Sequence, residues 1–157
     1  MKHKFKTIGL GGTFDRLHNG HKLMLDVAAF FGKEIHLGLT GNSYLMMRPK
    51  HLHRLIQNYQ TRYDNIVNYF KKHKINTLKI TELSRLGMDQ KLASESALEA
   101  LIVSQETLKG ALLINEHRIA NNKPILKILV IPFVLRENGS NESSTKLRYD
   151  DSNNKID

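Results

Sequence analysis

The chain contains no cysteine among its 157 residues. The absence excludes disulfide bonds, thiolate metal ligands and thiol catalysis. It also fits a reducing compartment, although a chain without cysteine does not require one.

Long apolar runs are absent as well. No stretch approaches the roughly 18–20 consecutive apolar residues that a membrane-spanning helix needs. The basic residues at 1–6 lead into an apolar strand that is too short for the core of a signal peptide. We therefore expect a cytoplasmic protein with no membrane partner.

Aromatic residues are few, at 7%, and acidic residues are outnumbered, with 15 Asp and Glu against 24 Lys and Arg. The resulting net charge of +9 favours anionic partners, which include nucleic acid and phosphorylated small molecules. The lysines are scattered rather than striped, however, so a basic composition without functional meaning explains the charge equally well. No RNA-recognition signature or zinc finger is visible, and nucleic acid is not an expected partner.

The length and composition predict a single domain over residues 1–157, with a tail at 150–157 that frays. Hydrophobic content of 40% and charged content of 25% are typical of globular domains, and no internal repeat is visible.

Apolar periodicity predicts alternating strands and helices. Strands are expected at 5–10, 34–40, 75–80, 98–103 and 126–133; helices are expected from about His21 to Phe31 with Gly32 closing the helix, at 52–70, at 104–121, and briefly from 143; loops are expected at 41–51, at 81–97 with a short helix, and at 136–142. This order predicts an α/β fold, namely a Rossmann-like, doubly wound, parallel five-stranded sheet with helices on both faces. Ligands of such sheets bind at the carboxyl ends of the strands.

The first candidate site lies where the first strand meets the first helix. Two glycines are followed by Thr13-Phe14-Asp15 and then by His18-Asn19-Gly20-His21. Glycines let backbone N–H groups approach an anion, and a helix N-terminus offers unpaired N–H groups and a positive dipole end. A Gly-Gly turn alone is common in α/β proteins, but its combination with two histidines is more specific. The stretch matches neither the P-loop nor the GxGxxG dinucleotide fingerprint.

Two further stretches follow later strands. Arg48 and Lys50 lie after the second strand, where they either clamp a phosphate or belong to a solvated basic loop. Ser104 stands at a helix N-cap position after the fourth strand, with Thr107 in the first turn. Both stretches are expected at the same edge of the sheet as the histidines.

The last candidate stretch is Ser143-Ser144-Thr145-Lys146-Leu147-Arg148. Hydroxyls and backbone N–H groups at a helix start bind phosphate oxygens, and an arginine one turn later adds a bidentate contact. Most Ser/Thr clusters are only caps or loops. Its place after the fifth strand, in a chain with two paired histidines, favours the phosphate interpretation.

These stretches resemble the signatures of a known superfamily. Residues 12–21 and 143–148 resemble the GTFD…HxGH and ISSTxxR signatures of nucleotidylyltransferases, which join a nucleotide's α-phosphate to an acceptor and release pyrophosphate. Residues 102–107, with Gly110-Ala111, Ile114-Asn115 and Arg118, resemble the VSxET…GA..IN..R stretch of archaeal phosphopantetheine adenylyltransferases and of the matching domain of eukaryotic CoA synthase. The resemblance covers Thr7 to Arg148. One departure is Glu142, which stands where the second signature has an aliphatic residue and places a negative charge near the expected phosphates.

The resemblance implies a reaction in which ATP and 4′-phosphopantetheine give dephospho-CoA and pyrophosphate. His21, with His18 beside it, would donate hydrogen bonds to the α-phosphate, Thr13 would bridge the two substrates, and Asp15 would order the loop. ATP would bind at Gly12, Thr13, Phe14, His18, His21, Ser104, Thr107, Ser143, Ser144, Thr145 and Arg148; the acceptor phosphate would bind at Thr13 and at Arg48 or Lys50. Mg²⁺ is expected with ATP, held mainly by phosphate oxygens and water rather than by protein ligands.

Two alternatives remain open. Another nucleotidylyltransferase, either a cytidylyltransferase or an FAD- or NAD-forming adenylyltransferase, shares the first two signatures. A basic nucleic-acid-binding module without turnover is the more distant alternative. No obligatory protein partner is evident.

Overall fold

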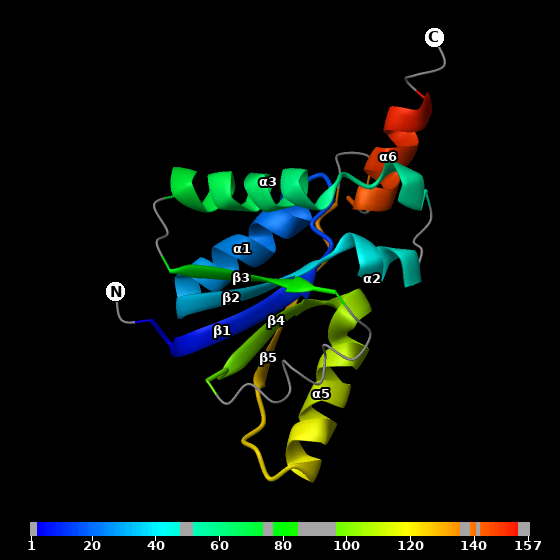
Figure 1. The fold of residues 1–157 in the computed structure, drawn as a ribbon. Helices are drawn as coiled ribbons and strands as arrows, with labels where there is room; N and C mark the ends of the chain where they lie inside the picture. The colour runs from blue at the N-terminus through cyan, green and yellow to red at the C-terminus, as the bar shows by residue number, and fades with distance from the viewer. Residues whose placement is uncertain are drawn as a thin grey trace.

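The protein is built on one five-stranded sheet in which every strand pair is parallel (Figure 1). The computed structural model describes residues 3–47, 52–73, 77–84, 97–135, 139–140 and 142–153. The strands are β1 (Phe5–Gly12), β2 (Gly32–Thr40), β3 (Leu78–Leu83), β4 (Ala100–Ser104) and β5 (Lys127–Ile131), in the order β3-β2-β1-β4-β5. The predicted doubly wound α/β sheet is confirmed.

Helices cover both faces of this sheet (Figure 1). Helices α1 (Asn19–Phe31) and α3 (Tyr59–Lys72) lie on one face, and α5 (Leu108–Ala120) lies on the other. The core divides accordingly. One cluster packs β1 and β2 against α1 and α3, with Ile8, Leu37 and Ile66 at its centre. The other packs β4 against α5, through Leu101, Val103 and Ile114.

The glycine pair ends β1 rather than forming the predicted turn. Gly11 and Gly12 continue the parallel ladder opposite Gly38 and Leu39, so the strand runs two residues beyond the predicted end at Leu10. The turn itself starts at Thr13 and contains left-handed backbone at Phe14 (φ 49°) and Arg16 (φ 48°).

The segment after β2 differs most from the prediction. A short helix, α2 (Asn42–Met47), occupies part of the predicted loop at 41–51. The helix expected from residue 52 begins instead at Tyr59, because the Asn58 side chain caps it by accepting a hydrogen bond from the Thr61 backbone N–H. Before that cap lies only a 3₁₀ turn (His53–Leu55), preceded by left-handed backbone at Leu52 (φ 53°).

Other boundaries shift by smaller amounts. β3 ends at Leu83 rather than at residue 80, since its pairing with β2 continues to Thr40 opposite Leu83. β5 ends before Pro132, which has no N–H for the ladder. Helix α6 (Ser144–Asn153) continues through residues 150–153, which were predicted to fray. Most of the predicted 81–97 loop lies outside the described residues.

Across the residues that the structure describes, no helix is long and apolar enough to cross a membrane.

Candidate active site

Residues from both predicted phosphate motifs line one cavity of about 380 Å³ at the carboxyl end of the sheet. The ends of β1, β4 and β5 reach it through Gly12, Ser104 and Ile131. Of the predicted site residues, the cavity brings together Gly12, Thr13, Phe14, His18, His21, Ser104, Thr107, Ser143, Ser144, Thr145 and Arg148. Arg48 and Lys50 lie outside the described residues.

The two histidines form a stacked pair. Their ring centroids are 3.8 Å apart with an interplanar angle of 29°, and the Phe14 ring lies 5.0 Å from that of His21. His18 is the N-cap residue of α1, which places His21 in the first helical turn. Gly20 permits this arrangement, because a Cβ atom there would come within 3.1 Å of the His18 ring. The backbone thus presents two imidazoles side by side at the helix start.

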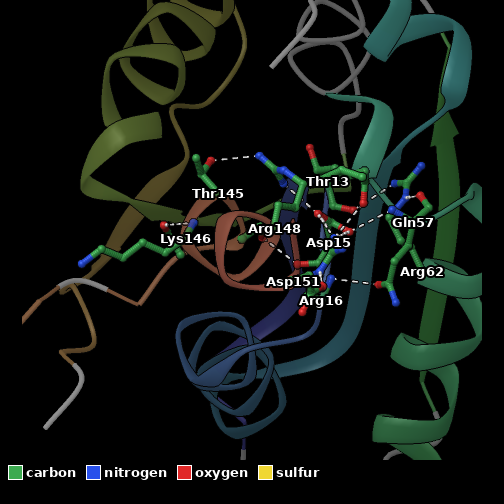
Figure 2. Close-up of polar contacts among 12 residues, drawn as sticks. Thr13, Asp15, Arg16, Gln57, Arg62, Thr145, Lys146, Arg148 and Asp151 are labelled. Carbon is green, nitrogen blue, oxygen red and sulfur yellow. Dashed lines mark hydrogen bonds and ion pairs between the residues drawn. The ribbon is translucent and has the colours of Figure 1, made fainter. Parts of the chain in front are cut away.

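Asp15 is fully buried and connects three segments of the chain (Figure 2). Its Oδ2 atom accepts a hydrogen bond from Nη1 of Arg148 at 2.7 Å, and its Oδ1 atom accepts one from the Gln57 backbone N–H at 3.0 Å. Arg16 adds a third contact, with its Nη1 3.1 Å from Oδ2. Asp15 therefore orders the loop, as its predicted role requires.

The start of α6 is attached to the same loop. The Ser144 hydroxyl donates to the backbone carbonyl of Asp15 at 2.6 Å. Nη2 of Arg148 donates to Oγ1 of Thr145 at 2.9 Å, and the Arg148 residue is 1% exposed. The second motif is thus fixed against the first before any ligand binds. This structural role of Arg148 was missed by the sequence prediction, which assigned the residue only to phosphate binding.

Arg62 is a second buried arginine that the sequence analysis missed. Its Nη1 donates to the carbonyls of Thr13 and Thr40 at 2.9 and 2.8 Å, so that α3 holds the ends of β1 and β2 together. Burial lowers the pKa of the Arg62 guanidinium, and the nearby Asp15 carboxylate opposes that shift. The signal was present in the sequence, because Arg62 lies four residues before buried Ile66 and therefore on the apolar face of the helix.

Thr13 has a buried hydroxyl that suits a ligand. The residue is only 7% exposed, and its Oγ1 atom makes no hydrogen bond with any part of the chain that the structure describes. Most buried polar groups in folded proteins have a partner, and one without a partner costs stability. Since Thr13 also lines the cavity, a bound substrate is a suitable partner for its hydroxyl.

Ser104 caps the turn that leads into α5, as predicted. Its backbone N–H donates to Oγ1 of Thr107 at 3.0 Å, and the two hydroxyl oxygens are 3.1 Å apart. The two side chains therefore stabilise a 3₁₀ turn (Gln105–Thr107) at the cavity wall.

Glu142 also lines the cavity, and its carboxylate is hydrogen-bonded to the first residue of α1. Oε2 accepts a hydrogen bond at 3.1 Å from the backbone N–H of Asn19, the first residue of that helix. The Glu142 backbone N–H donates to the Val134 carbonyl at 2.9 Å, which connects this residue to the segment after β5.

Comparisons with known proteins show the family to which the chain belongs. The cytidylyltransferase-like family model matches residues 10–149. A phosphopantetheine adenylyltransferase from Pyrococcus furiosus is 36% identical over 149 residues, which cover 94% of this chain and 90% of that protein.

Solved structures share the fold. A protein of unknown function from Archaeoglobus fulgidus has a TM-score of 0.69 and 26% identity, with 87% of this chain and 99% of that chain covered. The pantothenate synthetase of Thermus thermophilus has a TM-score of 0.60 at 12% identity, covering 92% of this chain and 62% of its own, which is a likeness of fold alone.

Proposed function

This chain belongs to the cytidylyltransferase-like family and, within it, to the phosphopantetheine adenylyltransferases, and we propose that it transfers AMP from ATP to 4′-phosphopantetheine. The products are dephospho-CoA and pyrophosphate, in a step of coenzyme A biosynthesis. The observation that supports this most is the convergence of the histidine pair, the Ser/Thr/Arg motif and the Ser104 turn on one cavity.

The reaction needs positioning and charge stabilisation more than covalent chemistry. The acceptor phosphate is already ionised, so it attacks the α-phosphorus in line without a base, and pyrophosphate leaves from the opposite side. His21 and His18 donate hydrogen bonds to the α-phosphate oxygens as negative charge develops there. The Thr13 hydroxyl and the backbone of residues 11–14 bridge the acceptor phosphate and ATP.

The second motif binds the remaining phosphates in this proposal. Ser143, Ser144, Thr145 and Arg148 hold the β- and γ-phosphates and then the leaving pyrophosphate. Because Arg148 is already hydrogen-bonded to Asp15 and Thr145, it is held in place before the phosphates arrive. Ser104 and Thr107 lie at the nucleotide edge of the cavity, and Arg48 or Lys50 neutralises the acceptor phosphate.

Mg²⁺ enters with ATP in this proposal. The described residues contain no group of three or more His, Asp or Glu side chains that could hold a metal ion. If ATP binds as its Mg²⁺ complex, phosphate oxygens and water would hold the cation, and it would supply charge neutralisation to the triphosphate. In this proposal the enzyme works in the cytoplasm, and the reaction requires neither nucleic acid nor a further protein.

A panel of nucleotides and acceptors tests the proposal. ATP and CTP are each combined with 4′-phosphopantetheine, nicotinamide mononucleotide, flavin mononucleotide and an alcohol phosphate, and pyrophosphate release is measured. We expect release only with ATP and 4′-phosphopantetheine. Release with CTP or with a mononucleotide acceptor would assign the chain to another branch of the family.

A further inference from the structure

Glu142 stands in the wall between two cavities. The first is the candidate active site, and the second is a separate cavity of about 610 Å³ lined by residues of α1, α3 and α6, among them Lys22, Asn65 and Lys72. Among the residues that the structure describes, only His18 and Glu142 line both cavities. A charged side chain at this point is therefore well placed to affect an anion bound in the active site.

The Glu142 carboxylate supplies a negative charge that α1 lacks by itself. The first turn of α1 has no acidic residue, and the His18 side chain makes no capping hydrogen bond. The only carboxylate that the described residues bring to the first backbone N–H of the helix is that of Glu142, from 123 residues away. A carboxylate is stabilised at this position by the free N–H groups and by the helix dipole.

A polyphosphate bound in the active site would use the same backbone N–H groups and the same helix dipole at the start of α1. Gly20 and His21 follow Asn19 directly and line the cavity, as does His18 before it. A carboxylate hydrogen-bonded to Asn19 and a phosphate bound by the adjacent residues repel each other in a partly buried site. The Thr13 hydroxyl lines the same cavity and has no hydrogen-bond partner among the described residues, which independently makes this cavity suitable for a ligand.

We infer that the Glu142 carboxylate is an internal anion that occupies the start of α1 in the nucleotide-free protein and is displaced when a polyphosphate binds. The inference rests on the proposed function for the identity of that polyphosphate as ATP or pyrophosphate. Glu142 thereby weakens the binding of every polyphosphate and sets the concentration at which substrate and leaving group occupy the site.

Binding of pyrophosphate and of ATP is measured by calorimetry in the unaltered protein and in Glu142→Gln, which keeps an acceptor oxygen but removes the charge. The control is Glu106→Gln, which removes the exposed carboxylate in the Gln105–Thr107 turn of the same cavity. We expect Glu142→Gln to bind both ligands about two- to fivefold more tightly, which is the typical range for one charge at an exposed helix terminus. Glu106→Gln is expected to change affinity by less than about twofold.

The second measurement follows the Asn19 amide by nuclear magnetic resonance. In the unaltered protein pyrophosphate is expected to shift the Asn19 signal as the carboxylate leaves, and Glu142→Gln alone is expected to shift it in the absence of ligand. The inference would be overturned if Glu142→Gln left the affinity unchanged, or if both variants gained affinity equally. It would also be overturned if the Asn19 signal did not move, or if pyrophosphate did not bind at all. Because pyrophosphate binding is measured without turnover, failure of this inference is distinguishable from failure to form dephospho-CoA.

Discussion

Asp15 and Arg148 form a buried ion pair with 2.7 Å between Oδ2 and Nη1, and this pair joins two sequence motifs that are 133 residues apart. The Ser144 hydroxyl, bonded to the Asp15 backbone, strengthens the same junction. The relative position of the two predicted phosphate motifs therefore depends on contacts inside the protein, before any nucleotide binds.

Breaking this pair from either side is expected to destabilise the fold. Asp15→Asn should lower the free energy of unfolding by about 3–5 kcal/mol, because it removes the carboxylate that faces the buried Arg148 guanidinium. Arg148→Met should lower it by less, because Arg16 and the Gln57 backbone N–H still donate to the Asp15 carboxylate. Urea denaturation measures the loss. The double variant should lose less than the sum of the two. A loss below about 1 kcal/mol in both single variants would show that the pair does not hold the motifs together.

Arg62 is expected to be structurally essential although no ligand role is assigned to it. Arg62→Met removes the donor shared by the Thr13 and Thr40 carbonyls and should lower the free energy of unfolding by about 2–4 kcal/mol. Arg54→Met is the matched control, since Arg54 is exposed, and it should change stability by less than about 0.5 kcal/mol. Equal effects of the two substitutions would contradict the role of Arg62 at the strand ends.

His21 is expected to affect turnover and not folding. His21→Ala should lower kcat by roughly 10²–10³, as for the loss of one preorganised hydrogen-bond donor to a developing charge. The control is His53→Ala, at an exposed histidine in the His53–Leu55 turn, which should leave kcat unchanged. Steady-state kinetics and thermal denaturation are measured together. Turnover of His21→Ala near that of the unaltered protein would remove His21 from the mechanism.

Tyr69 gives a prediction about pH. Burial, and secondarily the hydrogen bond from its hydroxyl to Asp26, raise the pKa of Tyr69 from 10.0 to about 12. The folded state therefore favours the neutral phenol, and the resulting stabilisation is fully present below pH 10 and is lost as the pH rises to about 12.

Tyrosinate absorbance during an alkaline titration measures this shift. Tyr69→Phe should remove the component at about 12, and Asp26→Asn should move it towards 10.0, since the negative charge of Asp26, which also raises the pKa of Tyr69, is then gone. An unchanged titration curve in Asp26→Asn would show that the contact between α1 and α3 does not influence Tyr69.

The sequence identified residues that line the cavity, but it did not identify the contacts that hold them in place. His18, His21, Ser144 and Thr145 were recognisable because motifs are local, and the alternation of strands and helices placed them at one edge of the sheet. The Asp15–Arg148 pair was not predicted, because neither motif indicates which charged side chain of a distant segment will contact its own.

The errors in the fold have local causes. The start of α3 at Tyr59 was missed because Leu52 and Leu55 happen to continue the helical spacing, whereas the Asn58 cap decides the boundary. Helix α2 was missed because Leu45, Met46 and Met47 are consecutive and show no period, and only Leu45 is buried. Arg62 was missed for a third reason, since a charged residue on the apolar face of a predicted helix is easily taken as an exception to the apolar pattern.

The most direct test of the account is the formation of dephospho-CoA, followed by mass spectrometry, from ATP and 4′-phosphopantetheine in the presence of Mg²⁺. We expect dephospho-CoA and pyrophosphate in equal amounts, with formation reduced roughly 10²–10³-fold in His21→Ala. No dephospho-CoA from the folded protein, under conditions in which ATP and the acceptor both saturate, would contradict it.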